Sequence, residues 1–157
     1  LTIPISMIHS IIFDWKRTLY NPDDGTLIDG SVEILEFLKK HNISLFLIGK
    51  GGLDMYSEVD RLGVKKYFKN IVFQEGAKEE TLFKPYVSNE NAHNTIFIGD
   101  RARSELAVGK ALGATTIWVR QGKFSEETPE NKDQESNYTV ASLRETKELL
   151  ASTFNIN

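Results

Sequence analysis

The interpretation of this chain begins with one stretch of its sequence, IIFDWKRTL at residues 11–19. Its first residues complete an apolar run over 8–13, broken by two polar positions, which stops at Asp14. Such a short apolar run predicts a strand buried on both faces of a parallel sheet. Two later stretches share the pattern: a run over 43–48 leads into GKGG, and a run over 95–98 leads into GD. The sequence therefore predicts buried strands whose carboxyl ends carry glycine, lysine or aspartate.

Amphipathic stretches with helix-capping signals alternate with these apolar runs. The expected strands lie at 8–13, 43–48, 70–73, 95–98, 114–119 and 138–140, and the expected helices begin near 31, 54, 75, 102 and 142. Asp54 is expected to cap the second helix, and Ser142 with Glu145 forms a capping box for the last. Regular alternation builds βαβ units, in which helices cover both faces of the sheet. We therefore expect a three-layer α/β/α, Rossmann-like fold with a central parallel sheet, as one domain over 1–157 with its core at about 8–152.

The composition restricts the class of protein. The 157 residues suit one domain, and 40% hydrophobic with 26% charged residues is ordinary for a globular chain. A formal charge of −3 argues against non-specific nucleic-acid binding. Cysteine is absent, which excludes disulfides and thiolate chemistry. No apolar run approaches the ~18 residues of a membrane span. The first ten residues also lack the features of a signal peptide, so we expect a cytoplasmic protein without a membrane partner.

Three strand ends carry residues capable of chemistry: Asp14, the pair Gly49-Lys50, and Asp100. In parallel α/β sheets, ligands bind beyond the carboxyl ends of the strands. Two carboxylates from neighbouring strand ends can share Mg²⁺, which prefers oxygen ligands and keeps several waters. Such a metal clamps a phosphoryl oxygen while one carboxylate attacks in line. The alternative is that each aspartate only caps the turn or helix that follows it.

Two motifs in this sequence resemble those of the haloacid dehalogenase (HAD) superfamily. Residues 11–19 resemble its motif I, an apolar strand followed by DxDxT, and residues 96–100 with Glu105 resemble its motif IV. Residues 111–119 and 138–150 resemble the elements that follow motif IV in that superfamily. The resemblance covers nearly the whole chain. It implies a HAD-like core, bound Mg²⁺, and an aspartyl-phosphate formed on a phosphorylated substrate, most often by a phosphatase.

The resemblance also assigns roles to particular residues. Asp14 would be the nucleophile and a metal ligand. The backbone carbonyl of Lys16 and the side chain of Asp100 would be further ligands, and Glu105 would support the metal shell.

A motif III lysine, which neutralises the phosphoryl group and the nucleophile, has two candidates. Lys84, followed by proline, has the common Lys-Pro form but lies only 16 residues before Asp100. Lys78 lies 22 residues before Asp100, which leaves room for a helix, and it is the favoured candidate. The alternative for both is an ordinary solvated lysine.

Two positions depart from the pattern of the superfamily. Lys16 stands where the second aspartate of motif I would act as general acid and base, and an ammonium cannot accept a proton unless its pKa is strongly depressed. Gly49 stands where motif II has a serine or threonine. Backbone amides near Gly49 can partly replace that hydroxyl as an anion nest. Together with the neighbouring Lys50 and with Thr18 of motif I, Gly49 is a candidate substrate-binding residue.

The spacing of the motifs leaves no room for a cap domain. Only 34 residues separate Asp14 from Gly49, and the segment 73–78 is short. An open site suits a large or macromolecular substrate, or completion by a second subunit of a homo-oligomer. We therefore expect a capless, Mg²⁺-dependent HAD-like phosphatase of low or specialised activity. The rival is a HAD-fold binding or regulatory module without turnover. A two-component receiver domain is disfavoured because residues 74–75 supply no acceptor aspartate.

Overall fold

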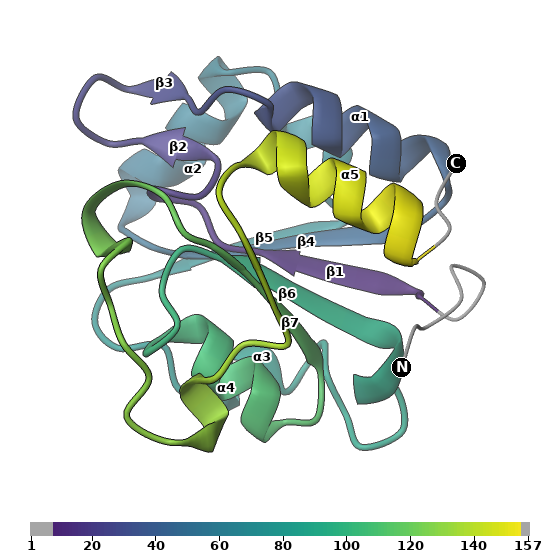
Figure 1. The fold of residues 1–157 in the computed structure, drawn as a ribbon. Coiled ribbons are helices and arrows are strands. Elements are labelled where there is room, and N and C mark those ends of the chain that lie inside the picture. The colour runs from purple at the N-terminus through teal and green to yellow at the C-terminus, as the bar shows by residue number, and fades with distance from the viewer. Residues whose placement is uncertain (1–7, 155–157) are drawn as a thin grey trace.

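The centre of the molecule is a six-stranded parallel sheet, and the computed structural model describes residues 8–154 (Figure 1). Its strands are β1 (Ser10–Phe13), β4 (Ser44–Lys50), β5 (Asn70–Gln74), β6 (Thr95–Gly99), β7 (Thr115–Val119) and β8 (Tyr138–Val140). Their spatial order is β5-β4-β1-β6-β7-β8, and every neighbouring pair is parallel. The predicted central parallel sheet is confirmed, and β1 lies inside it.

Helices cover both faces of this sheet (Figure 1). The helices are α1 (Ser31–Lys40), α2 (Leu53–Arg61), α3 (Glu80–Phe83), α4 (Glu105–Ala111) and α5 (Leu143–Thr153). Side chains of α1, α2 and α5 share one hydrophobic core with Ile11 and Phe13 of β1. Ile12, which points to the other face of the strand, belongs to a second core with side chains near α3 and α4. The three-layer α/β/α architecture follows from these two cores.

The strand register brings the ends of β1 and β6 together. Phe13 pairs with Ile98 on β6 and with Leu47 on β4. The backbone N–H of Asp14 extends the ladder by donating to the carbonyl of Ile98 at 3.0 Å. Asp14 and Asp100 therefore leave the sheet from adjacent strands at the same edge.

The connections between the strands also contain a small hairpin and several one-turn helices. Between β1 and α1, β2 (Tyr20–Asn21) and β3 (Thr26–Leu27) form an antiparallel hairpin. One-turn 3₁₀ helices occur at Lys65–Tyr67, Ala92–Asn94, Gly122–Phe124 and Lys132–Gln134. Within residues 8–154, no connection contains a domain-sized insertion. None of the helices in this part of the chain is long and apolar enough to cross a membrane.

Three helix boundaries differ from the sequence prediction. The helix expected from residue 75 is only the short α3, because Gly76 turns the chain with φ 88 and the backbone is still extended at Glu79. The helix expected from residue 102 begins at Glu105. The second helix follows Gly52, so the prediction that Asp54 caps it is wrong.

The last helix begins as its sequence predicted. The side chain of Ser142 accepts the backbone N–H of Glu145 at 3.1 Å.

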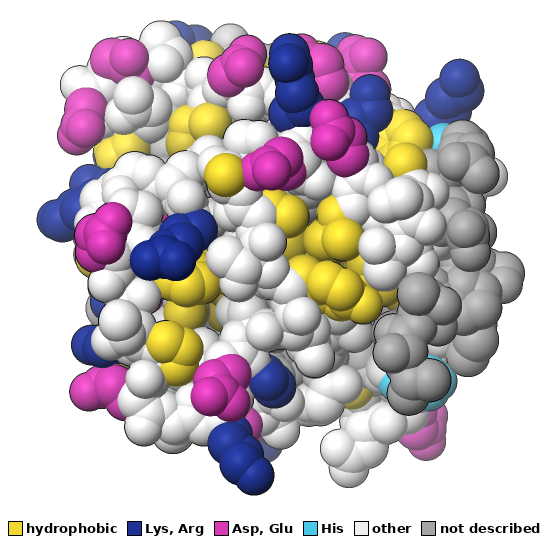
Figure 2. All heavy atoms as spheres, viewed as in Figure 1, with side chains coloured by type: hydrophobic (Ala, Val, Ile, Leu, Met, Phe, Trp, Pro, Cys, Tyr) yellow, Lys and Arg dark blue, Asp and Glu magenta, His cyan; other side chains and the backbone are white. Residues whose placement is uncertain are grey.

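On the face of the molecule drawn in Figure 2, acidic and basic side chains are interspersed rather than gathered into a field of one sign. That distribution accords with the small net charge of the chain.

Candidate active site

Asp14 directly follows β1 and is 6% exposed. Its two carboxylate oxygens have different partners. The hydroxyl oxygen of Thr18 lies 3.2 Å from Oδ2, and the ammonium group of Lys78 forms an ion pair with Oδ1. A tight turn returns Thr18 to this point, since its backbone N–H donates to the carbonyl of Trp15 at 3.2 Å. The same hydroxyl lies 3.4 Å from Oδ1 of Asp100, so Thr18 lies between the two aspartates.

Asp100 directly follows β6, Glu105 is the first residue of α4, and both are buried. The carbonyl of Asp100 accepts a hydrogen bond from the indole Nε1 of Trp118 at 2.9 Å. Oε2 of Glu105 accepts the backbone N–H of Arg101 at 2.9 Å. A Cβ atom on Gly99 would lie 2.7 Å from this oxygen, so glycine at this position makes room for the carboxylate.

Of the two candidate lysines, the structure brings Lys78 to the carboxylates. Lys78 is 8% exposed, and its Nζ lies 3.3 Å from Oε1 of Glu105 in addition to its contact with Asp14. It lies in the segment before α3 rather than in a helix. Lys84, at the end of α3, is exposed.

The three acids form a group that can hold a cation. Carboxylate oxygens of Asp14, Asp100 and Glu105 lie within 4.8 Å of one another. Oδ2 of Asp100 is buried and has no hydrogen-bond partner among the described residues. Buried polar atoms nearly always have a hydrogen-bond partner or a bound ion, so this oxygen is a candidate metal ligand. Hard oxygen donors that converge in this way fit Mg²⁺. Within residues 8–154, the carbonyl of Lys16 accepts no backbone hydrogen bond from the turns and loops.

Burial and mutual repulsion dominate the electrostatics of this group. Burial, then the charges of Asp14 and Glu105, raise the pKa of Asp100 to about 10. Burial and the charge of Asp14 raise the pKa of Glu105 to about 7. Burial alone would lower the pKa of Lys78, but the adjacent carboxylates outweigh it and raise that pKa. Without a cation Asp100 therefore retains its proton at neutral pH, and a bound cation would displace that proton.

A cavity of about 220 Å³ opens above these groups. Its lining consists of acids and cations with one aromatic ring and one serine: Asp14, Lys16, Arg17, Lys50, Lys78, Asp100, Arg101, Ser104, Glu105 and Phe124. Of the residues predicted for the site, Gly49, Thr18 and the alternative lysine Lys84 are not part of this lining. Thr18 nevertheless contacts the aspartates directly.

The connection between β7 and β8 supplies site residues that sequence reasoning missed. From the sequence alone, residues 121–137 of this connection are polar and charged and predict only a loop. In the structure Phe124 lines the cavity, and the guanidinium carbon of Arg101 lies 4.1 Å from the centre of its ring. Gln121 donates from Nε2 to the carbonyls of Arg17 and Thr18 at 3.2 and 3.3 Å. The sequence signal for these residues was a phenylalanine and a glutamine within a charged stretch. It was not sufficient, because their contacts with the site depend on the path of the chain in the fold.

Aromatic packing explains why glycine occupies position 49. A Cβ atom there would lie 2.9 Å from both Cε1 of Phe73 and Cβ of Trp15. Trp15 in turn stacks on Tyr20 with ring centres 5.0 Å apart. The expected anion nest is also reduced, because the amide of Gly51 already donates to the carbonyl of Gln74 at 3.2 Å. The ring of Phe73 and the Cβ atom of Trp15 therefore leave no room for the Cβ of a serine or threonine at position 49.

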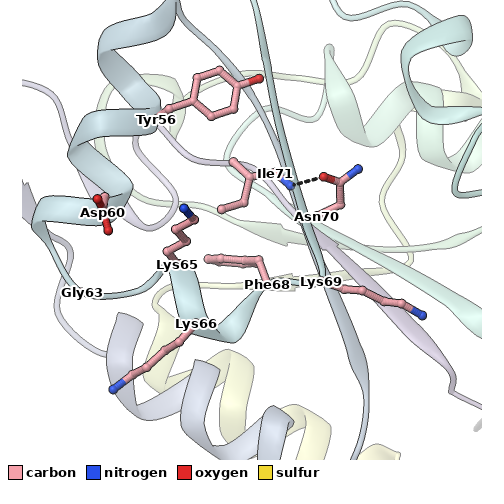
Figure 3. Close-up of a pocket in the computed structure, with 9 residues that line it drawn as sticks. All are labelled: Tyr56, Asp60, Gly63, Lys65, Lys66, Phe68, Lys69, Asn70 and Ile71. Carbon is pink, nitrogen blue, oxygen red and sulfur yellow. Dashed lines mark hydrogen bonds between the residues drawn. The ribbon is translucent and has the colours of Figure 1, made fainter.

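A larger hollow lies elsewhere, beside the edge strand β5. It measures about 810 Å³, and the close-up in Figure 3 shows Lys65, Phe68 and Ile71 turned toward its centre while Lys66 and Lys69 extend away. Asp60 is the single carboxylate in its lining, and it is exposed. Perturbed, desolvated charges mark functional sites better than volume does. The smaller cavity is therefore the candidate active site.

Comparison with known sequences finds HAD-like relatives. Residues 72–146, which include Lys78, Asp100 and Glu105, match the model of a family described as HAD-hydrolase-like. A curated relative, the glyceraldehyde 3-phosphate phosphatase of Methanocaldococcus jannaschii, is 26% identical over 125 residues. That alignment covers 73% of this chain and 52% of the relative. The chain thus spans about half the length of the curated relatives it matches.

Solved structures share the fold. The magnesium-bound HAD-hydrolase YfnB of Bacillus subtilis superposes with a TM-score of 0.65 at 21% identity, covering 80% of this chain and 57% of that one. A haloacid dehalogenase-like hydrolase of Xanthomonas campestris superposes with a TM-score of 0.75 at 13% identity, covering 94% and 96%. At these identities the likeness concerns the fold.

Proposed function

This chain belongs to the haloacid dehalogenase superfamily, and from that premise we propose that it is a Mg²⁺-dependent phosphatase that acts through an aspartyl-phosphate on Asp14. One observation carries the proposal. The buried carboxylate of Asp14 lies between a lysine and a threonine, beside a second buried aspartate that has an unsatisfied oxygen. The phosphatase activity of the curated relatives supports this class of reaction for a chain that spans half of their length.

The residues of the site divide the reaction between them. An oxygen of Asp14 attacks phosphorus, and a new P–O bond forms as the ester P–O bond breaks. Lys78 stays beside this carboxylate and offsets the negative charge of the phosphoryl group. Thr18 orients the nucleophile through its hydroxyl. Water then attacks phosphorus, which releases inorganic phosphate and regenerates Asp14. Asp14, Asp100 and the Lys16 carbonyl would hold Mg²⁺, which would supply Lewis-acid stabilisation of charge on phosphoryl oxygens.

Lys16 limits the second half of this reaction. As an ammonium it can donate a proton to the departing alkoxide, but it does not readily deprotonate the attacking water. General base help of this kind contributes ~10²–10⁴-fold to rate. We therefore propose that phosphoryl transfer to Asp14 outpaces hydrolysis of the aspartyl-phosphate.

A second candidate function follows from the same residue. If the aspartyl-phosphate is never turned over, the chain is a HAD-fold binding or regulatory module. Lys16 and the filled space at Gly49 are the observations that favour it.

The test compares Asp14→Asn with wild type on an aryl phosphate in Mg²⁺. We expect the variant to lose hydrolysis while keeping its fold, and Asp23→Asn, an exposed aspartate of the β2–β3 hairpin, to behave as wild type. Wild type is expected to give an early burst and an acid-stable, hydroxylamine-sensitive acyl phosphate, and Lys16→Asp to turn over faster. Equal activity of Asp14→Asn and wild type would exclude the mechanism. A burst without turnover would favour the regulatory module.

A further inference from the structure

The rim of the active-site cavity carries cations that have no charged partner in residues 8–154. Lys16, Arg17 and Lys50 line the cavity, and none of them forms an ion pair within this described part of the chain. We propose that this rim binds a second anionic group of the substrate, so that the substrate is a small phosphate monoester with a carboxylate or a second phosphate. The phosphomonoester half of this inference rests on the proposed function.

The charge balance of the cavity supports this substrate class. A divalent cation together with Lys78 neutralises the three carboxylates on the floor of the cavity. The guanidinium of Arg101 is already paired, since Nη2 lies 2.7 Å and Nε 3.0 Å from Oε2 of Glu127. The three rim cations remain. A phosphomonoester dianion neutralises two of them, and one cation is left for another negative group of the same ligand.

The fold constrains the backbone of the rim cation Arg17. Its backbone adopts the left-handed conformation, φ 65, which a non-glycine residue keeps only where neighbours enforce it. Its N–H donates to the carbonyl of Tyr20 at 2.7 Å, and its carbonyl accepts Nε2 of Gln121 at 3.2 Å. Its guanidinium carbon lies 5.8 Å from the ring centre of Phe124. A half-buried guanidinium beside this ring suits the planar, two-pronged binding of a carboxylate or phosphate.

The size of the cavity restricts the ligand further. About 220 Å³ is smaller than the ~300–1,000 Å³ of pockets that bury drug-sized ligands. Phe124, from the connection after β7, forms part of the rim. The site therefore favours a ligand of a few carbon atoms over the large substrate that a capless site suggested.

The experiment uses non-hydrolysable analogues, so that it does not depend on turnover. Calorimetry in saturating Mg²⁺ compares 3-phosphonopropanoate with propylphosphonate, which has the same carbon skeleton but no carboxylate. We expect the carboxylated analogue to bind wild type at least about tenfold more tightly, as charge-assisted hydrogen bonds do. A diphosphonate of the same chain length shows whether carboxylate or phosphate is preferred.

Variants locate the preference. Arg17→Gln should bring the two affinities to within about twofold, and Lys69→Gln, an exposed lysine beside β5, should retain the wild-type preference. Equal binding of the two analogues to wild type, or a preference that survives in folded Arg17→Gln, would overturn the inference. Equal binding together with phosphate ester hydrolysis would leave the proposed phosphatase intact. A preference without hydrolysis would support the binding of a ligand with two anionic groups and refute the phosphatase.

Discussion

The two cavities of this molecule differ in how the chain builds them. The hollow beside β5 is the larger and is lined by residues close together in sequence, between Tyr56 and Ile71, whose lysines are exposed. The cavity above β1 is about a quarter of that volume and gathers buried charges from Asp14, Lys78 and Asp100, which are far apart in the sequence. Desolvated charges are costly unless they are paired or bind a ligand. The buried charges of the smaller cavity therefore indicate a functional site, whereas the exposed lysines of the larger hollow do not.

Removal of Lys78 should have the largest effect on stability. In Lys78→Met the carboxylates of Asp14 and Glu105 lose their buried cation. Breaking such a pair costs ~3–5 kcal/mol of unfolding free energy. Urea unfolding in metal-free buffer measures the loss, and added Mg²⁺ should restore part of it. The control is Lys84→Met, the exposed lysine six residues later, which should remain within ~0.5 kcal/mol of wild type. Equal stability of the two variants would show that the Lys78 contacts carry no net energy.

The filled space at Gly49 predicts the next largest effect. In Gly49→Ser the new Cβ meets Phe73 and Trp15 at 2.9 Å, and overpacking of this kind costs ~1–3 kcal/mol. Gly52→Ser is the matched control, because the nearest atom to its Cβ is a flexible carboxylate oxygen of Asp54 at 3.3 Å, and serine is a good N-cap for α2. Chemical unfolding of both variants makes the comparison. A Gly49→Ser protein as stable as Gly52→Ser would mean that the aromatic rings move aside easily.

These effects also show where sequence reasoning succeeds and where it stops. The parallel sheet and the proximity of Asp14 and Asp100 could be predicted, because apolar runs fix strands and carboxyl ends of parallel strands share one edge. Lys78 is favoured over Lys84 only through the family resemblance and its spacing from Asp100, and the structure brings it to Asp14. Phe124 could not, because its contact with the site depends on the path of a loop without periodic pattern. The reason for Gly49 lies in the packing of Trp15, which no local pattern reveals.

Metal binding should depend on pH with a definite sign. Since burial raises the pKa of Asp100 to about 10 and of Glu105 to about 7, the metal-free site holds protons at neutral pH that Mg²⁺ must displace. The apparent affinity for Mg²⁺ should therefore rise with pH, by up to about tenfold per unit between about pH 7 and pH 9 for one proton released. Thermal stabilisation by Mg²⁺ at several pH values measures this. An affinity that is constant over that range would show that Asp100 is already ionised.

Asp100→Asn separates this site effect from a general effect of pH. The amide cannot be ionised, so the variant should lose most of the Mg²⁺-dependent stabilisation and its pH slope. A variant that keeps the slope would place the released proton elsewhere.

The smallest effect is expected in the larger hollow. Lys65→Ala removes the cation that points toward its centre (Figure 3). Because Lys65 is exposed and forms no ion pair in the described residues, its loss should change stability by no more than ~0.5 kcal/mol. The Mg²⁺-dependent thermal shift should be unchanged, because the hollow shares no lining residue with the carboxylate site. A Lys65→Ala protein with a weakened Mg²⁺ response would show that the two cavities are coupled through β5. The hollow beside β5 would then be part of the functional site rather than an ordinary surface feature.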